Sequence, residues 1–343
     1  MTTARLQAIG RAVPERRYTQ EALYAMNPWE DSPLMDKLFL DSPVRSRGLF
    51  VPPEWYGQPR SLTETNRAWK EGALRLGGAA LRDALERSAR ALTEVDLLAV
   101  TTVTGYATPG LDLLLAYQEG LRDDLGRAHF NCIGCHAAVP LLKVAADHAA
   151  ARPGSTAVAL AVEICSACFS DEPEAQNLVA LSLFGDGAAA AVVGTEGDGP
   201  RIVDFASRYD YEHLDALAFG LTTRGFRIVL DPTIPDLVAD RLAETVEVLL
   251  ARHDLPHSAV SLWALHPGGS RILDRAGTRL GLTDAQLAPS RRVLAHHGNM
   301  SSPSVLFVLA EALADGHARA GSYGIAAAFG PGLGVEVALL AFD

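Results

Sequence analysis

The chain has 343 residues, of which 48% are hydrophobic and 21% charged, and its formal net charge is -11. This length exceeds the size at which a single hydrophobic core keeps growing, so two similar halves or two packed domains are expected. The acidic balance argues against a nucleic-acid-binding surface, which needs clustered Lys and Arg. It still allows a local basic mouth for an anionic substrate.

The N-terminal segment MTTARLQAIGRAVPERR lacks the apolar core of an export signal. We also find no run of about 18 to 20 apolar residues, the length needed to cross a bilayer. A cytoplasmic protein that does not bind a membrane is therefore expected. Its 4 cysteines should remain thiols, because disulfides are rare in that compartment.

Hydrophobic periodicity in the first half predicts alternating helices and strands. Pro153 and Gly154 mark the end of the third helix. The strands are continuously apolar, which is typical of a sheet covered by helices on both faces. We expect helices at 66–92, 111–121 and 137–154, and strands at 95–103, 126–134 and 155–164.

The second half repeats this style. FGDGAAAAVVG and FGPGLGVEVALL each place a Phe-Gly-x-Gly turn before an apolar strand. The similarity predicts an internal duplication, with related α/β halves at 1–199 and 200–343. We expect helices at 237–255, 270–282 and 301–321, strands at 260–266 and 291–298, and two closing strands within 323–342.

The segment NCIGCH at 131–136 has four interpretations. Its C-x-x-C-H pattern matches a c-type haem attachment sequence, but this requires export. With the second C-x-x-C pair, Cys165 and Cys168, it could form a zinc site, although the 29 residues between the pairs are long for one. Cys132 and Cys135 could also form a redox pair, with Pro140 in the first helical turns.

The fourth interpretation makes Cys135 a nucleophile and Cys132 a buried strand residue. Cys135 lies at a predicted strand-to-helix turn, where free N–H groups and the helix macrodipole favour a thiolate. His266 and Asn299 occupy similar turns, and Ser301 or Ser302 could cap the next helix. Since ligands gather outside the carboxyl ends of strands in α/β sheets, these three side chains could converge. Each could also be an ordinary structural residue.

These residues resemble the type III polyketide synthases, the chalcone and stilbene synthase-like enzymes of the thiolase fold. The resemblance runs from about Tyr18 to the C-terminus. HPGG and GNMSS are its most specific parts, because the related ketoacyl-ACP synthase III enzymes differ there. The matching stretches are TGYATPGLD, IGCHAA, LFGDGAAAAVVG, WALHPGGSRIL, HHGNMSSPSVLFVL and AAFGPGLGVE.

By this resemblance, Cys135 carries the acyl group and His266 and Asn299 complete a triad. Both would donate hydrogen bonds to the thioester oxygen as charge develops, and His266 would pair with a Cys135 thiolate. His136 departs from the family, which usually has a small or aromatic residue there.

The resemblance also implies a substrate cavity and a coenzyme A mouth. Phe184 and Phe226 would be aromatic gatekeepers, with ordinary core packing as the alternative. Arg45 and Arg47 would contact the coenzyme A phosphates, unless they are simply a solvated face. Further cavity residues would be Thr108, Cys165, Cys168, Leu217, Ser301, Gly330, Pro331 and Gly332.

The expected protein is therefore a homodimer with the thiolase-like αβαβα five-layer sandwich. It would condense malonyl-CoA onto an acyl-CoA starter with loss of carbon dioxide, and it would need no metal or redox cofactor. One alternative is a ketoacyl-ACP synthase III-like enzyme that takes its acyl group from an acyl carrier protein. An alternative of another class is a zinc- or redox-binding protein that uses both C-x-x-C pairs.

Overall fold

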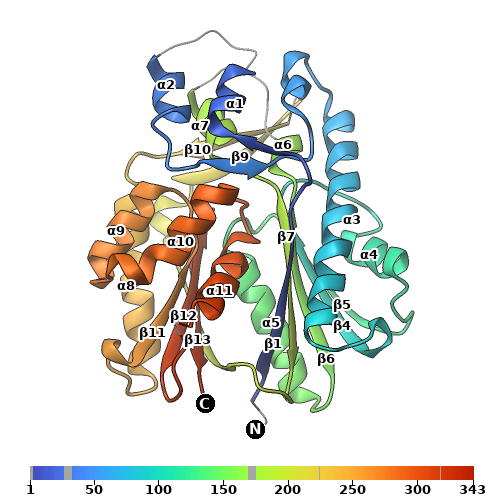
Figure 1. Ribbon diagram of the computed structural model, residues 1–343, viewed down its shortest axis with the longest axis vertical. Coiled ribbons are helices and arrows are strands. Elements are labelled where there is room, and N and C mark those ends of the chain that lie inside the picture. Colours follow the sequence, from blue (N-terminus) through green and yellow to red (C-terminus); the bar gives the residue numbers. More distant parts are fainter. Residues whose placement is uncertain (1–2, 27–32, 169–174, 224, 317) are drawn as a thin grey trace.

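The computed structural model describes residues 3–26, 33–168, 175–223, 225–316 and 318–343. Its main sheet has nine strands in the order β11-β12-β13-β8-β1-β7-β6-β4-β5 (Figure 1). The strands are β1 (Arg5–Ala12), β4 (Val95–Thr102), β5 (Gly126–Asn131), β6 (Thr156–Glu163), β7 (Gly187–Gly194), β8 (Arg201–Tyr209), β11 (Val260–Leu265), β12 (Tyr323–Gly330) and β13 (Gly334–Ala341).

The sheet has the same strand pattern on either side of its centre. In β1-β7-β6-β4, the first two neighbouring pairs are antiparallel and the last is parallel. The series β8-β13-β12-β11 repeats this order of pairings. The division into related halves at 1–199 and 200–343 stays a prediction, and this repeated pattern supports it.

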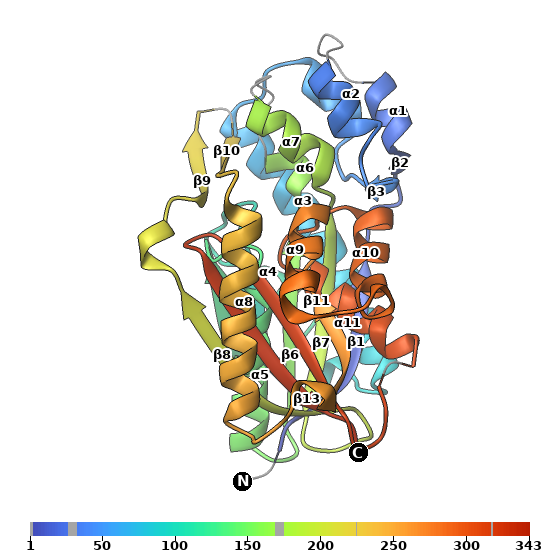
Figure 2. The same cartoon turned by 90° about the vertical axis from the view of Figure 1, so that its left-hand side faces the viewer.

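Helices form three layers around these strands. The helices α5 (Ala138–Ala151) and α11 (Ser304–Ala314) lie in the middle and contact strands of both series (Figure 1). On one outer face, α3 (Leu62–Arg87) and α4 (Leu111–Glu119) pack together. On the other, α8 (Ile234–Ala251) runs along β8 and β13 beside α9 (Ser270–Leu280) (Figure 2). The five-layer αβαβα architecture is confirmed.

The middle layer is built largely from alanine. Ala138, Ala145 and Ala149 of α5 are fully buried against strand residues such as Ala159 and Ala189. Small side chains let a helix approach a sheet closely, so the layers form a continuous core. The larger fully buried side chains Trp69 and Trp263 lie in the two outer clusters instead.

Smaller elements cap one end of the sandwich, at the top of Figure 1. They position the residues that surround Cys135. They are α1 (Gln20–Ala25), α2 (Pro33–Phe39), β2 (Arg17–Thr19), β3 (Ser46–Gly48), α6 (Cys165–Cys168), α7 (Ala175–Leu183), β9 (Leu217–Thr222), β10 (Gly225–Leu230) and the 3-10 helix η1 (Pro53–Gly57). Of the other 3-10 helices, η2 (Leu92–Glu94) and η4 (His257–Ala259) directly precede β4 and β11, and η3 (Tyr211–His213) follows β8.

The predicted strand at 291–298 is wrong. Residues 291–297 belong to α10 (Asp284–His297), which begins at a capping box made by Thr283 and Gln286 and ends at the C-cap Gly298. The apolar residues Leu287 and Leu294 are buried, one helical repeat of seven residues apart. The predicted segment 291–298 was too short to show this helical period.

The other predicted helices and strands form, with ends that differ by a few residues. Strands β4, β6 and β11 and helices α5, α8 and α9 lie within or close to their predicted ranges. The helix predicted at 301–321 ends at Ala314. Within the described residues, no helix is long and apolar enough to cross a membrane.

Candidate active site

Cys135 lies between β5 and α5, as predicted. Gly134 has φ 102, in the left-handed region that favours glycine, and its carbonyl accepts the Ala137 amide at 3.0 Å. The Cys135 sulfur is buried and accepts a hydrogen bond from the Ser301 hydroxyl at 3.3 Å. The thiol is therefore positioned at the start of the central helix α5.

His266 directly follows β11 and is 1% exposed. Its amide donates to the Ala327 carbonyl of β12 at 2.8 Å, which extends the parallel pairing past the end of the strand. The imidazole meets the Phe329 ring edge to face, with 5.1 Å between centroids. A rigid sheet edge therefore fixes this ring.

Asn299 connects the other two positions. Its Nδ2 lies 3.5 Å from the Gly268 carbonyl in the turn after His266, and its Oδ1 accepts the Ser301 amide at 2.8 Å. The Ser301 hydroxyl in turn reaches Cys135. Asn299 follows the helix α10 rather than a strand, and it forms a parallel bridge with Phe184. A chain of hydrogen bonds thus runs from Cys135 through Asn299 to the turn after His266.

Burial controls the protonation of this site. It raises the pKa of Cys135 to about 12, although the Ser301 hydroxyl opposes this shift. Burial also lowers the pKa of His266 to about 3, and His136 adds to this effect. These shifts favour a neutral thiol and a neutral imidazole at pH 7. The thiolate–imidazolium pair of Cys135 and His266 stays a prediction, and the burial of both groups opposes it.

Glu163 is a functional candidate that the sequence interpretation missed. It ends β6, is fully buried, and accepts hydrogen bonds from Thr104 Oγ1 at 2.8 Å and from Ser302 Oγ at 2.6 Å. The backbone N–H of Val103 also donates to it at 2.9 Å. Burial raises its pKa to about 7. The signal was a single acidic residue at the end of the apolar strand STAVALAVEI.

A small cavity of about 10 Å³ lies beside Ser301, whose hydroxyl contacts Cys135. Phe219 belongs to it but was not predicted; its ring meets that of Phe226 at 86° across the β9–β10 hairpin. Aromatic rings and two thiols thus make the wall largely apolar. The lining residues are Val103, Thr104, Cys165, Cys168, Phe184, Phe219, Phe226 and Ser301.

Comparison with known proteins identifies the family. Residues 55–197 match "Chalcone and stilbene synthases, N-terminal domain", and residues 211–342 match the corresponding C-terminal domain. The chain belongs to the chalcone and stilbene synthase family. Its relatives are type III polyketide synthases, so the chain is an acyltransferase of this class, whose general reaction condenses malonyl-CoA onto a starter.

Two curated members of this family are similar over nearly the whole chain. The 1,3,6,8-tetrahydroxynaphthalene synthase of Streptomyces peucetius subsp. caesius is 36% identical, covering 97% of this chain and 92% of that protein. The 3,5-dihydroxyphenylacetyl-CoA synthase of Streptomyces toyocaensis is 34% identical, covering 98% and 89%.

Solved structures of the family agree in fold. The 1,3,6,8-tetrahydroxynaphthalene synthase of Streptomyces coelicolor A3(2) superimposes with a TM-score of 0.92 at 27% identity, covering 99% of each chain. PKS-I of the brown alga Ectocarpus siliculosus gives a TM-score of 0.91 at 26% identity, covering 99% of this chain and 98% of that chain.

Three residues inferred from the family resemblance do not line this small cavity. Arg47 is buried, and its guanidinium donates to Gln20 Oε1 at 3.1 Å and to the Phe184 carbonyl at 2.5 Å; it is a structural residue, because the short strand β3 turns it inward. Thr108 is exposed, and its hydroxyl donates to Tyr106. Leu217 packs in the outer core beside α8. None of the three lines the small cavity.

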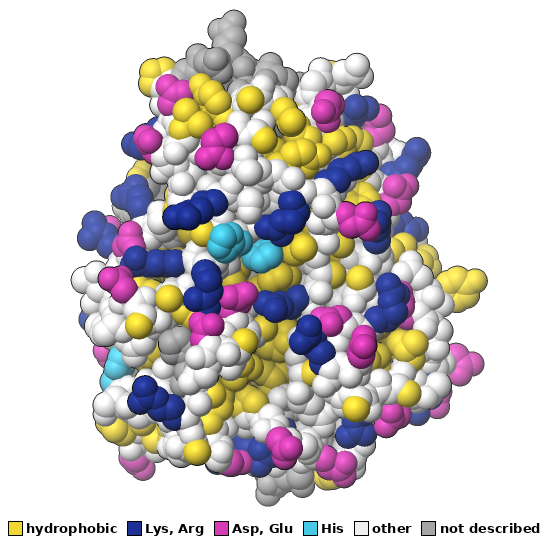
Figure 3. All heavy atoms as spheres, viewed as in Figure 1, with side chains coloured by type: hydrophobic (Ala, Val, Ile, Leu, Met, Phe, Trp, Pro, Cys, Tyr) yellow, Lys and Arg dark blue, Asp and Glu magenta, His cyan; other side chains and the backbone are white. Residues whose placement is uncertain are grey.

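Arg45 remains a candidate for binding coenzyme A. It is exposed and lies at a surface hollow beside α10, on the face where Figure 3 shows Lys and Arg side chains around histidines. Among the described residues, its guanidinium has no ion-pair partner. The polar side chains of the hollow are Ser42, Arg45, Ser270, Asp274, Asp284, Arg291, Arg292 and His296.

The remaining predicted residues form the turn between β12 and β13. A Cβ built on Gly330 would lie 3.1 Å from the Cys135 amide nitrogen, and one on Gly134 would lie 2.5 Å from Cδ of Pro331. Gly332 has φ 80 and donates its amide to the Leu217 carbonyl at 3.4 Å. The turn therefore packs directly on the segment that carries Cys135.

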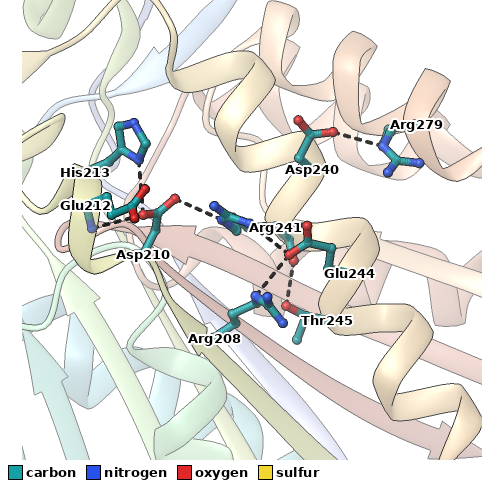
Figure 4. A network of polar contacts seen from close by, with 9 residues as sticks. All are labelled: Arg208, Asp210, Glu212, His213, Asp240, Arg241, Glu244, Thr245 and Arg279. Carbon is teal, nitrogen blue, oxygen red and sulfur yellow. Dashed lines mark hydrogen bonds and ion pairs between the residues drawn. The ribbon is translucent and has the colours of Figure 1, made fainter.

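The opposite side of this turn is anchored to α8. The Asp210 amide donates to the Leu333 carbonyl at 3.1 Å, and its buried carboxylate accepts from Arg241 Nε at 2.9 Å. Arg241 also pairs with Glu244, which pairs with Arg208 (Figure 4). The turn is thus held between α8 and the Cys135 segment.

The four cysteines do not form one site. Cys132 is exposed, with φ 61 directly after β5, so its prediction as a buried strand residue is wrong. Cys135, Cys165 and Cys168 are buried in one apolar cluster. Among the described residues, no group of three or more His, Cys, Asp or Glu side chains could hold a metal ion. This geometry argues against the alternative that both C-x-x-C pairs bind zinc.

Proposed function

We propose that Cys135 is the acyl carrier of this polyketide synthase. The Cys135 sulfur attacks the thioester of an acyl-CoA starter, and the proton of the thiol passes to the sulfur of coenzyme A, which leaves as the free thiol. The acyl group is then bound to the enzyme. Malonyl-CoA then loses carbon dioxide, and the resulting enolate carbon attacks the acyl carbonyl. A carbon–carbon bond forms and the Cys135 thiolate is released.

His266 and Asn299 stabilise the enolate in this proposal. A neutral imidazole N–H and an amide N–H₂ can both donate hydrogen bonds to the thioester oxygen where negative charge develops. The pKa of His266, lowered to about 3 by burial, favours the neutral form. The observation that carries the proposal is the chain of contacts from Cys135 through Ser301 and Asn299 to Gly268.

The substrates would be coenzyme A thioesters, with Arg45 contacting the phosphates, and no metal or redox cofactor is required. A homodimer is expected. The second candidate function is acyl transfer from an acyl carrier protein. The exposed basic side chains near Arg45 (Figure 3) suit either an acidic carrier or the phosphates of coenzyme A.

Intact-mass measurement tests both the nucleophile, Cys135, and the source of the acyl group. We expect wild-type enzyme to gain one acyl group from acyl-CoA, and Cys135→Ala to gain none. Cys132→Ala is the matched control, because that thiol is exposed three positions away and should not affect acylation.

Intact-mass measurement also compares the two acyl donors, acyl-CoA and the acyl carrier protein. Acylation from the carrier-bound group alone would favour the carrier-protein alternative. Acylation of Cys135→Ala at the wild-type rate would contradict the role of Cys135.

A further inference from the structure

His136, the residue after Cys135, is 3% exposed. Its ring lies over two glycines that pair with each other at the ends of β12 and β13. A Cβ built on Gly330 would lie 2.4 Å from Nδ1 of His136, and one on Gly334 would lie 2.9 Å from Nε2. The imidazole thus occupies the space that side chains at these two positions would need.

This contact places Cys135 as well as His136. The Cβ position of Gly330 is only 3.1 Å from the Cys135 amide nitrogen, and Gly134 meets Pro331 in the same way. The turn cannot easily retreat, because Leu333 is bound to Asp210 and, through Arg241, to α8 (Figure 4). The His136 ring is therefore held between the nucleophile segment and an anchored turn.

The surroundings of His136 favour its neutral form. Within the described residues, Nδ1 of His136 and Nδ1 of His266 have no hydrogen-bond partner. Burial lowers the pKa of His136 to about 4. A charge on His136 would also lower the pKa of His266. The pKa of His266 therefore depends on whether His136 is protonated.

The other titratable groups near this contact are already engaged. Cys135 precedes His136 and receives the Ser301 hydroxyl. Across Gly334 lies the Tyr209 ring, whose hydroxyl donates to Glu336 at 2.7 Å. The second oxygen of Glu336 accepts the Ser207 hydroxyl at 2.6 Å. Beyond Cys135, Glu163 is bound by hydroxyl and amide donors.

We propose that His136 is a positioning residue that fixes Cys135 against the Gly330–Gly334 pair. The proposal rests on the function proposed above, because it assumes that Cys135 takes part in the reaction. It explains why an imidazole, rather than a larger aromatic ring, follows the nucleophile.

A double-mutant cycle tests the contact without using activity. Gly334→Ala is expected to lower the melting temperature in the wild-type background, because its Cβ needs space within 2.9 Å of His136. In the His136→Ala background the loss should be clearly smaller. Equal losses in both backgrounds would overturn the contact. If His136→Ala does not fold, the cycle with His136→Asn decides.

The steady-state kinetics of product formation test the positioning. We expect His136→Ala to lower kcat about tenfold with KM unchanged, since small displacements of reacting groups cost up to about 100-fold. His136→Asn, which fills much of the same space, should recover most of the rate.

The two failures can be told apart. Wild-type kcat in His136→Ala would overturn the positioning role. Product formation by Cys135→Ala at the wild-type rate would instead overturn the proposed function. The double-mutant cycle with Gly334→Ala measures only the melting temperature, so it would still decide whether His136 contacts Gly334.

Discussion

Glu163 shows how strongly one buried residue can respond to its surroundings. Its carboxyl group accepts two backbone amides and the hydroxyls of Thr102, Thr104 and Ser302. These donors connect the loop after β4 with the segment after Asn299. Even so, desolvation dominates and raises its pKa. Glu163 therefore links pH to the stability of the active-site wall.

Stability should depend on pH through Glu163. Its pKa is raised from 4.5 to about 7, so the folded state binds a proton that the unfolded state has lost between these pH values. Glu163 therefore contributes its full stabilisation of the folded state below about pH 4.5, and this stabilisation is lost as the pH rises to about 7. At about 1.4 kcal/mol for each tenfold change in proton affinity, this amounts to roughly 3 kcal/mol.

Urea unfolding at several pH values measures this contribution. Glu163→Gln should remove the fall in stability, because a neutral amide can keep an acceptor toward the Val103 and Thr104 donors. An equally steep fall in the variant would show that another group is responsible. Enzyme with Asp343→Asn, a change at an exposed carboxylate, is the control and should behave as wild type over this range.

Ser301→Ala should make Cys135 less reactive. The Ser301 hydroxyl lowers the pKa of Cys135 against the effect of burial, so its loss raises the pKa and decreases the thiolate fraction at a given pH. A net hydrogen bond of about 1 kcal/mol predicts roughly fivefold slower alkylation. Iodoacetamide labelling of Cys135 across pH 7 to about 10 measures this. Ser302→Ala, whose hydroxyl donates to Glu163 instead, should react like wild type.

At the scale of elements, α10 and the β9–β10 hairpin shape the site. The helix ends at His297, two residues before Asn299, so its register places the amide next to the turn after His266. The hairpin brings Phe219 and Phe226 into the cavity wall. The position of Asn299 thus depends on a helix that begins at Thr283.

Thr283→Ala should destabilise the protein by about 1 kcal/mol, because it removes the N-cap hydrogen bond to Gln286 and the capping box. Chemical denaturation measures the loss. The control is Thr278→Ala, since that hydroxyl donates to the Asp274 carbonyl within its own helix. A loss no larger than that of the control would contradict the cap.

Phe219→Ala should enlarge the cavity and increase the rate with longer acyl-CoA starters relative to short ones. The physical reason is the removal of an aromatic ring from the wall of a cavity of only about 10 Å³. Single-turnover acylation of Cys135 by a series of chain lengths measures the preference. Leu221→Ala lies on the same strand but is 65% exposed, and should leave the preference unchanged.

At the scale of the whole molecule, the alanine-rich middle layer joins the two series of strands. Since α5 and α11 contact both, neither series keeps its core without the other. This predicts a single cooperative unfolding transition at fixed protein concentration. Val308→Ala in α11, at a fully buried position, should lower stability by about 2 kcal/mol without splitting the transition.

Calorimetry measures this cooperativity. Two separate transitions, with only one shifted by Val308→Ala, would indicate independent halves. Val248→Ala on the outer helix α8 removes the same atoms from a side chain that is 46% exposed. It should therefore change stability much less.

The sequence by itself determined the alternation of helices and strands, the family, and the turns that carry Cys135, His266 and Asn299. These features are local: periodicity and turn residues act over a few neighbours. One local prediction was still wrong: residues 291–298 were expected to form a strand, because their helical period shows only together with the residues from 284 onward.

Only the tertiary structure decided which side chains face the site. Spacing could not show that Arg47 turns inward while Arg45 stays exposed, that Cys132 is exposed after β5, or that Phe219 enters the cavity. Burial and electrostatics depend on neighbours distant in sequence. For the same reason, the neutral forms favoured at Cys135 and His266, and the packing of His136 on Gly330, emerge only from the folded chain.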